Sequence, residues 1–426
     1  MHAMTLTLVF VAFIVASLLV QLWLDTRQLR HVMRHREHVP PAFADEVSLA
    51  QHQRAAAYTA DKLQFGLLSA VVSTATLVAW TLLGGLNELN QWLRASVLPE
   101  WGSMAYQLSI LGCFALIGGL IDLPLSAWST FRIEQKHGFN RMTPGMWIGD
   151  LIKQTLVGVI LGAPIAALIL WLMGAAGPQW WLWAWVAWVS FSLLLMVIFP
   201  IFIAPLFNKF EPLDDQHLAD RVTQLMKRCG FQAKGLFVMD GSRRSAHANA
   251  YFTGLGASKR VVFFDTLLKK LNHGEVEAVL AHELGHFKHK HVLKRMVMMF
   301  VMSLAGFALL GWLTQQVWFY QGLGVQPNMQ APNHALALLL FMLALPVFLF
   351  FVSPVFAALS RRDEYQADAY ACLQARREDL ASALIKLYKD NSSTLTPDPM
   401  YVRFHYSHPP AAERLAAMAA LKRAQA

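Results

Sequence analysis

The sequence predicts a mainly α-helical, polytopic membrane protein with seven transmembrane helices. Hydrophobic residues make up 56% of the 426 residues and charged residues only 15%, whereas ordinary soluble domains carry about 25% charged residues. Seven apolar runs approach the roughly 20 residues that a helix needs to cross the hydrocarbon core of a bilayer. Lys and Arg concentrate in particular connecting segments, as is usual in membrane proteins. A large soluble core would not combine these three features.

The expected spans follow one another along the whole chain. They cover residues 4–24, 64–86, 105–128, 154–174, 180–206, 296–316 and 334–357. The first run is expected to be a retained helix rather than a cleaved signal peptide. No Lys or Arg precedes it, and it ends in Val20-Gln21-Leu22-Trp23-Leu24 instead of small residues.

The distribution of Lys and Arg predicts the orientation of these spans. Basic residues follow the first, third, fifth and seventh spans, whereas the segments after the fourth and sixth contain none. Because basic loops stay in the cytoplasm, we expect the N-terminus outside and the C-terminus inside. The net charge of +9 follows this topology and does not indicate nucleic acid. Cys113, Cys229 and Cys372 show no metal or redox spacing.

A metal-binding motif lies between the fifth and sixth expected spans, at His282-Glu283-Leu284-Gly285-His286. On a helix, residues four apart share a face about one turn apart, so both imidazoles can bind a single Zn²⁺. Glu283 is placed to take a proton from a water that the metal activates. The polar start at 272–275 and the apolar stripe that follows predict a helix here. A His-rich surface helix is the plain alternative.

A catalytic zinc needs a third protein ligand and one open position. His289 shares the helical face, but seven residues place it about 10 Å along the axis from the first histidine, too far for one ion. Segment 360–371 offers Glu364 as the third ligand and Asp368, one turn on, as hydrogen-bond partner of a ligand histidine. Asp363 points about 100° away and is a weaker choice. A solvated helix end is the alternative.

A predicted hairpin provides candidate substrate contacts. Residues 248–254 resemble a strand, followed by a Gly-rich turn and a second strand at 261–264. An exposed edge strand near the zinc would bind an extended peptide, with Asn249 and Tyr251 near its backbone. A plain hairpin that supports the zinc helix is equally compatible with the pattern.

The C-terminal segment offers a candidate for oxyanion stabilisation. His408 precedes Pro409-Pro410, and its imidazole can donate to the oxyanion that forms as water attacks a peptide carbonyl. His405 is a competitor three residues earlier. A purely structural role in the loop is the alternative for either histidine.

The motifs resemble those of the M48 zinc metallopeptidases, and among these the integral-membrane type I CAAX prenyl proteases. The pairing of residues 282–286 with 360–368 carries the resemblance. Further matching segments are 134–140, 203–210, 247–252 and 406–410. The resemblance implies His282, His286 and Glu364 as ligands of one Zn²⁺ per chain and Glu283 as general base. It also implies that the seven helices enclose a water-filled chamber, with the active site facing inward.

We therefore predict a zinc-dependent metalloendopeptidase. The expected organisation is a five-span membrane region at 1–206, a protease segment with the zinc helix at 207–295, spans six and seven at 296–357, and a C-terminal segment with the third ligand at 358–426. The protease part is expected to be gluzincin-like, with a small β-hairpin or sheet.

The sequence predicts the class of substrate and the type of membrane, but no individual substrate. The substrate is a peptide or protein, either a prenylated CAAX-type tail or membrane-associated polypeptides cleared without lipid specificity. Membrane lipid is an expected partner, nucleic acid is not, and a monomer suffices. The charge pattern resembles a bacterial inner-membrane protein with the zinc site on the cytoplasmic side. A transporter or scaffold with a structural zinc is the alternative class, and a fourth protein ligand would indicate it.

Overall fold

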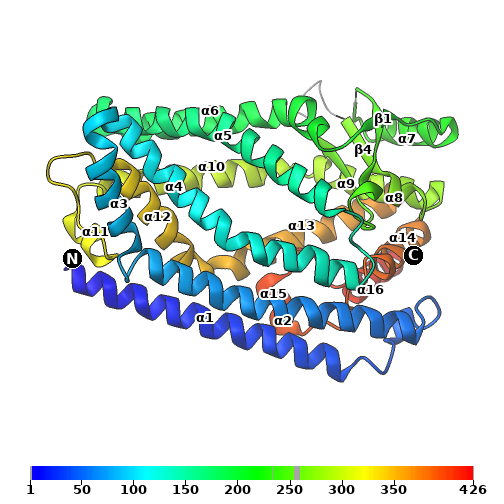
Figure 1. The fold of residues 1–426 in the computed structure, drawn as a ribbon. Helices are drawn as coiled ribbons and strands as arrows, with labels where there is room; N and C mark the ends of the chain where they lie inside the picture. Colours follow the sequence, from blue (N-terminus) through cyan, green and yellow to red (C-terminus); the bar gives the residue numbers. More distant parts are fainter. Residues whose placement is uncertain (1, 233, 254–259, 426) are drawn as a thin grey trace.

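The computed structural model is an elongated helical protein whose small sheet lies at one end (Figure 1). It describes residues 2–232, 234–253 and 260–425. Within these, seven helical segments are long and apolar enough to cross a membrane: Ala3–Arg34, Leu49–Trp80, Leu98–Glu134, Pro144–Ala175, Gly177–Leu206, His291–Leu313 and His334–Gln374. The predicted mainly helical, seven-span class is confirmed.

The membrane part contains the longest helices. These are α1 (Ala3–Arg34), α2 (Leu49–Trp80), α3 (Gly85–Ser96), α4 (Leu98–Trp128), α5 (Pro144–Ala175), α6 (Trp180–Ile198), α10 (His291–Leu313), α11 (Val317–Gly322) and α12 (His334–Leu349). Two π-helical segments, Ser129–Glu134 and Phe199–Ile203, extend α4 and α6. In Figure 1, α1 and α2 run side by side, and α5 and α6 form a second pair.

The second span ends earlier than the sequence predicts. Its hydropathy continues to residue 86, but α2 stops at Trp80 and the chain turns into α3. Gly84 adopts a φ of 81°, which glycine tolerates best. A Cβ on Gly85 would lie 2.6 Å from the carbonyl oxygen of Ala79. The two glycines therefore permit a tight reversal inside an apolar run.

The protease part combines short helices with a four-stranded sheet. The helices are α7 (Gln216–Arg228), α8 (Asp265–Leu268), α9 (His273–Lys288), α13 (Ser353–Gln374), α14 (Arg377–Asp390), α15 (Pro399–His405) and α16 (Ala411–Gln425). The α12 helix leads through a 3₁₀ turn at Phe350–Val352 directly into α13. The boundaries proposed at 295 and 357 thus fall inside α10 and α13, which extend from the membrane part into the protease part.

The sheet has the order β1-β2-β4-β3, from β1 (Phe210–Pro212), β2 (Leu236–Met239), β3 (Ala250–Thr253) and β4 (Arg260–Phe264). β2 and β4 are parallel, and the two outer pairs are antiparallel. β4 is central and buries Val261, Val262 and Phe263, whereas β3 lies at an edge. The Gly-rich turn predicted between β3 and β4 lies outside the described residues.

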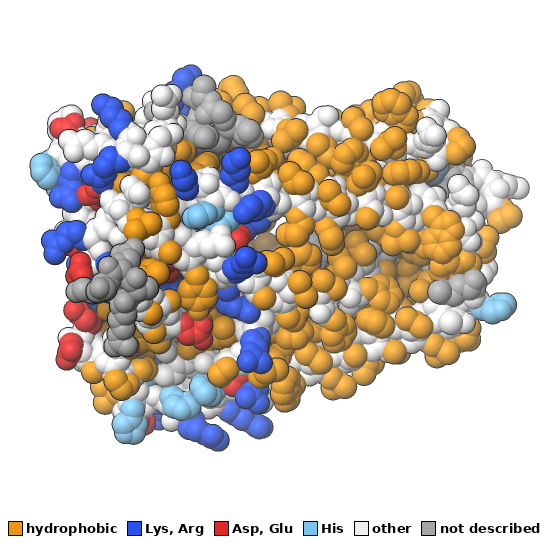
Figure 2. Space-filling model, turned by 180° about the vertical axis from the view of Figure 1, so that it is seen from behind, with side chains coloured by type: hydrophobic (Ala, Val, Ile, Leu, Met, Phe, Trp, Pro, Cys, Tyr) orange, Lys and Arg blue, Asp and Glu red, His pale blue; other side chains and the backbone are white. Residues whose placement is uncertain are grey.

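Most membrane-helix surface is not covered by other helices. One apolar cluster, with Phe10, Tyr106 and Leu340 in it, fills the end of the bundle remote from the sheet, and another fills the protease part. In six of the seven spans only 6–17% of the most apolar window is buried. Figure 2 shows the hydrophobic side chains covering one part of the molecule and the charged side chains the other. Exposed apolar surface of this kind suits contact with lipid; the chamber itself stays a prediction.

Candidate active site

Helix α9, which carries the histidine motif, begins with a capping box. The Asn272 side chain accepts a hydrogen bond from the Glu275 amide, and the Glu275 carboxylate accepts one from the Asn272 amide, both at 2.9 Å. The buried Glu275 carboxylate also accepts from Ser382 Oγ at 2.7 Å and Lys386 Nζ at 2.8 Å. These contacts fix the start of α9 and attach it to α14.

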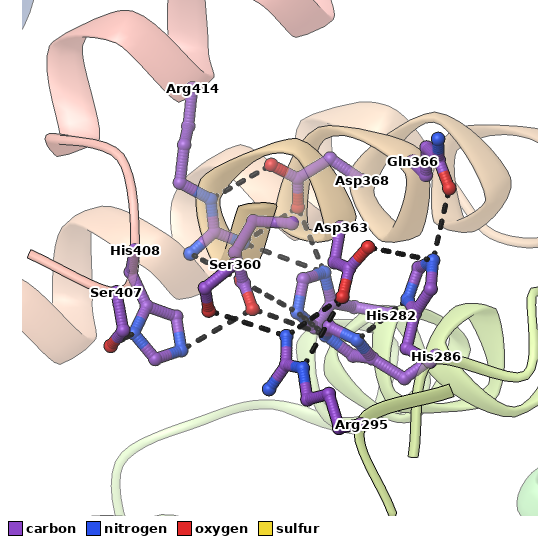
Figure 3. Close-up of polar contacts among 12 residues, drawn as sticks. His282, His286, Arg295, Ser360, Asp363, Gln366, Asp368, Ser407, His408 and Arg414 are labelled. Atoms are coloured by element: carbon purple, nitrogen blue, oxygen red, sulfur yellow. Dashed lines mark hydrogen bonds and ion pairs between the residues drawn. The ribbon is translucent and has the colours of Figure 1, made fainter. Parts of the chain in front are cut away.

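Helices α9 and α13 bring three potential metal ligands together (Figure 3). His282, His286 and Glu364 each offer one ligand atom, and these atoms all lie within 4.8 Å of one another. The two Nε2 atoms are 3.3 Å apart, and the Glu364 oxygens lie 3.4 Å from His282 Nε2 and 3.3 Å from His286 Nε2. Residues 78 positions apart in the sequence thus converge on one point. We call these three residues the metal cluster.

The separations within the metal cluster fit a tetrahedral zinc site. Zinc bonds to His nitrogen and carboxylate oxygen are about 2.0–2.1 Å long, which places tetrahedral ligands about 3.3–3.4 Å apart. Oε2 of the buried Glu364 makes no hydrogen bond within the described structure, although a buried polar atom normally has a partner. A cation between the three side chains would satisfy it.

An acidic side chain orients His282. Asp368 Oδ1 lies 2.9 Å from His282 Nδ1, so Nδ1–H donates and Nε2 keeps its lone pair for a metal. Arg414 donates to both Asp368 oxygens, at 2.8 and 2.6 Å. Burial alone would lower the pKa of His282, but hydrogen bonding to Asp368 and Glu364 raises it to about 9. Without a metal the two carboxylates would keep His282 protonated, and a cation bound at Nε2 would take the place of that proton.

A second chain of hydrogen bonds orients His286. Its Nδ1 lies 3.0 Å from Nδ1 of the buried His291, whose Nε2 lies 3.0 Å from Gln366 Oε1. If His291 donates to the Gln366 amide oxygen, it accepts from His286 and leaves the Nε2 lone pair of His286 free. Asp363 is not part of the metal cluster: its carboxylate lies 3.5 Å from His291 Nε2 and accepts a hydrogen bond from Arg295 at 3.1 Å. Its position agrees with its expected direction around the helix.

Glu283 lies in a cavity that opens onto the metal cluster. This active-site cavity has a volume of about 850 Å³ and is bounded by the metal cluster, by Glu283 and Tyr251, and by apolar side chains of α6, α10 and the π segment after α6. Burial raises the pKa of the Glu283 carboxyl above its ordinary value. A carboxylate in such surroundings is a better proton acceptor than one in water.

The structure separates the two C-terminal histidines. His408 borders the active-site cavity, and its Nε2 lies 3.4 Å from Glu364 Oε1. Its Nδ1 lies 2.9 Å from Ser407 Oγ. His405 instead packs its ring against Tyr401 at a centroid distance of 4.5 Å. His408 is therefore the one placed to contact a substrate.

The two predicted substrate contacts on the edge strand face different cavities. Tyr251 lines the active-site cavity. Asn249 lies just before β3 and lines a separate polar cavity of about 740 Å³ between α1, α2 and the protease loops. Its side-chain oxygen accepts a hydrogen bond from the Ala250 amide at 2.8 Å. Residues two apart share a face only within a regular strand. Because β3 starts at Ala250, Asn249 lies outside the strand and need not face the same cavity as Tyr251.

Comparison with known proteins decides the family. Residues 28–209 match the model for "CAAX prenyl protease N-terminal, five membrane helices", and residues 212–422 match the model for peptidase family M48. The chain belongs to peptidase family M48. The M48 chain is 35% identical to CAAX prenyl protease 1 homolog of Arabidopsis thaliana, covering 96% of each. It is 33% identical to CAAX prenyl protease 1 of Saccharomyces cerevisiae, covering 96% of this chain and 94% of that one.

A solved structure agrees with this assignment. The crystal structure of S. mikatae Ste24p superposes with a TM-score of 0.89 at 32% identity, covering 97% of this chain and 98% of the other. The M48 chain is accordingly a zinc metalloprotease and an integral membrane protein, as the sequence predicts.

Three site residues of the M48 chain were missed by the sequence analysis. Arg414 lies in α16, 46 residues after its partner Asp368, and nothing in its local sequence marks it. His291 was seen only as part of a His-rich run. Gly285 lies inside the motif, where a Cβ would be 2.9 Å from Ala367 Cα. The presence of glycine within a helix, where it is unfavourable, was the available signal for a close approach.

Proposed function

We propose that His282, His286 and Glu364 hold one Zn²⁺ and that the chain hydrolyses internal peptide bonds at this site. The single observation that carries the proposal is the set of 3.3–3.4 Å separations among the two Nε2 atoms and the Glu364 carboxylate, whose Oε2 has no hydrogen bond within the described structure. The ion, when bound, polarises the scissile carbonyl and acidifies water. Only these three groups converge in the described part of the chain, which leaves a position open and disfavours a closed structural zinc.

The protein side chains then move the proton and orient the groups. Glu283 accepts the proton of the attacking water and returns it to the leaving amine. Its position in the cavity wall beside the two histidines, together with its raised pKa, supports this role. His408 donates its Nε2–H to the carbonyl oxygen as charge develops there. Asp368 and Arg414 hold His282 in the tautomer that exposes Nε2.

The edge strand supports binding of an extended substrate. Within the described residues, β3 pairs with β4 alone, and α9 lies against it. A peptide added to the free edge would pass beside the metal cluster and Tyr251. Asn249 lines another cavity. We therefore do not propose that it contacts the substrate at the scissile bond.

We propose that the substrates are CAAX-type C-terminal tails, which carry a prenyl group on Cys. Two relatives named CAAX prenyl protease 1 or its homolog support this, because the match extends over 94–96% of their length. The exposed apolar walls of the active-site cavity, among them Met196 and Phe199, also suit an aliphatic or lipidated ligand. Lipid-independent clearance of membrane polypeptides is the second candidate.

We further propose a cytoplasmic-side active site in a bacterial inner membrane. Figure 2 shows Lys and Arg gathered where the hydrophobic surface meets the polar end that contains the protease part. Such a basic border marks the cytoplasmic side of membrane proteins.

The test compares Glu283→Gln with the wild-type protein. We expect wild-type zinc content by metal analysis and a loss of nearly all peptide hydrolysis, because glutamine cannot accept the proton. Mass spectrometry of peptides retained by the variant then separates prenylated tails from unrelated membrane peptides. Hydrolysis at the wild-type rate would remove Glu283 as the base.

A further inference from the structure

Lys290 is an unusual residue at the end of the zinc helix. It joins α9 to α10 with φ 58° and ψ 31°, and among the described residues only it and Ser392 are non-glycine residues at positive φ. Glycine adopts this left-handed conformation freely, whereas a side chain makes it unfavourable. Strained residues of this kind cluster at functional sites. The lysine therefore calls for an explanation beyond the turn.

The side chain of Lys290 is exposed and has no hydrogen bond or ion pair within the described structure, yet it lines the active-site cavity. The other permanent cation on the wall, Arg295, is neutralised by Asp363 at 3.1 Å. An unpaired ammonium in a largely apolar cavity provides a site for an anion. In an enzyme for peptides, the anion common to all C-terminal tails is the terminal carboxylate.

The position of Lys290 just past the end of α9 fits such a carboxylate. Glu283 lies five residues before Lys288, the last residue of α9, which corresponds to about 7.5 Å along the helix axis. Lys290 follows two residues later, so the two residues lie roughly 10 Å apart in this direction. Three residues of an extended peptide also span about 10 Å. A CAAX tail has three residues after its Cys, so a bond cleaved directly after that Cys lies about this far from the free carboxylate.

We propose that Lys290 binds the C-terminal carboxylate of the substrate and thereby selects tails with a free end about three residues beyond the scissile bond. The inference rests on the proposed function and names a specificity subsite within the same cavity. Val292 and Leu293, which follow on α10, present half-exposed aliphatic side chains to the cavity. The aliphatic residues of the tail would contact this wall while the carboxylate reaches the ammonium.

The test uses two peptides of identical sequence that end in a carboxylate or a carboxamide. For the zinc-loaded protein in detergent, we expect kcat/KM to favour the carboxylate by about tenfold, the size of one charge-assisted contact. Lys290→Gly should bring the ratio close to one. Glycine suits the backbone at this position, so misfolding would not explain the loss. Lys290→Arg should keep the preference, and Lys290→Glu should invert it.

The control is Lys288→Met, which removes an exposed charge two residues away that does not line the cavity. It should retain the tenfold ratio. Binding of the same peptides, measured by fluorescence anisotropy in the Glu283→Gln background, should show the same preference without turnover. A wild-type ratio near one, or a preference that survives Lys290→Gly, would overturn the inference. If neither peptide is hydrolysed, the proposed function fails, and the binding ratio still decides the role of Lys290.

Discussion

The close approach of α9 and α13 at Gly285 allows a sharp test of how the fold builds the metal cluster. Replacing Gly285 by Ala would place a Cβ 2.9 Å from Ala367 Cα and 3.0 Å from its carbonyl oxygen. Both of these are backbone atoms of α13, and ordinary contacts of a Cβ lie at 3.4–4 Å. The two helices must therefore move apart by about 0.5–1 Å to relieve the contact.

This movement should weaken zinc binding more than it lowers the free energy of unfolding. Glu364 lies one turn from Ala367 on α13, whereas metal–ligand distances tolerate only about 0.2 Å. We expect zinc affinity to fall about 10- to 100-fold, the range seen when ligands lose their positioning. Overpacking costs about 1–3 kcal/mol, but alanine gains about 1 kcal/mol over glycine in a helix. The net loss of unfolding free energy should be only about 1 kcal/mol.

The assay is competition of the purified protein with a zinc chelator of known affinity, accompanied by thermal unfolding with and without zinc. Gly306→Ala is the matched control, because Gly306 lies within helix α10 and a Cβ there would meet nothing closer than 3.9 Å. The control should bind zinc like the wild type and unfold no earlier. Wild-type zinc affinity in Gly285→Ala would refute the idea that this contact sets the ligand geometry.

Other consequences follow from the contacts of the site. Asp368→Asn should lower zinc affinity about 10- to 100-fold, measured by the same competition, because an amide orients His282 less firmly. Glu275→Ala should cost about 1–3 kcal/mol in unfolding experiments, because it leaves the Asn272 amide and two side-chain donors without an acceptor. Burial raises the pKa of Glu283 above its ordinary 4.5, so kcat/KM should fall with decreasing pH through a value above 4.5 as the base takes up a proton; an acid limb that lies below 4.5 would contradict this. Removal of zinc by a chelator should abolish hydrolysis, and added Zn²⁺ should restore it.

Features encoded by nearby residues could be predicted from the sequence. The apolar runs are long enough to mark the spans regardless of how the helices pack. The helix start at Asn272 and the spacing of His282 and His286 depend only on local geometry. Glu364 could be predicted as the third ligand because a catalytic zinc needs three protein ligands and the histidine motif supplies only two.

Features that depend on the approach of distant segments could not be predicted from the sequence. The partnership of Asp368 with Arg414 joins α13 to α16, and local pattern carries no signal for it. The end of α2 at Trp80 was misplaced because hydropathy continues past the turn that Gly84 makes. Asn249 and Tyr251 were paired on the assumption of a strand from residue 248, and the actual start of β3 puts them on different cavities.

The last expected span and the third candidate ligand belong to one continuous helical segment. The 3₁₀ turn at Phe350–Val352 joins α12 to α13 in one helical segment from His334 to Gln374, so Glu364 is carried on the continuation of the last expected span. About 11 residues separate Glu364 from the start of α13, which places it about 16 Å along the helix axis. Because the predicted last span ends at residue 357, we expect the metal cluster to lie about 10 Å beyond its end. A lipid-anchored substrate of the proposed kind would then reach the site from the membrane, whereas a freely soluble peptide must first approach the surface.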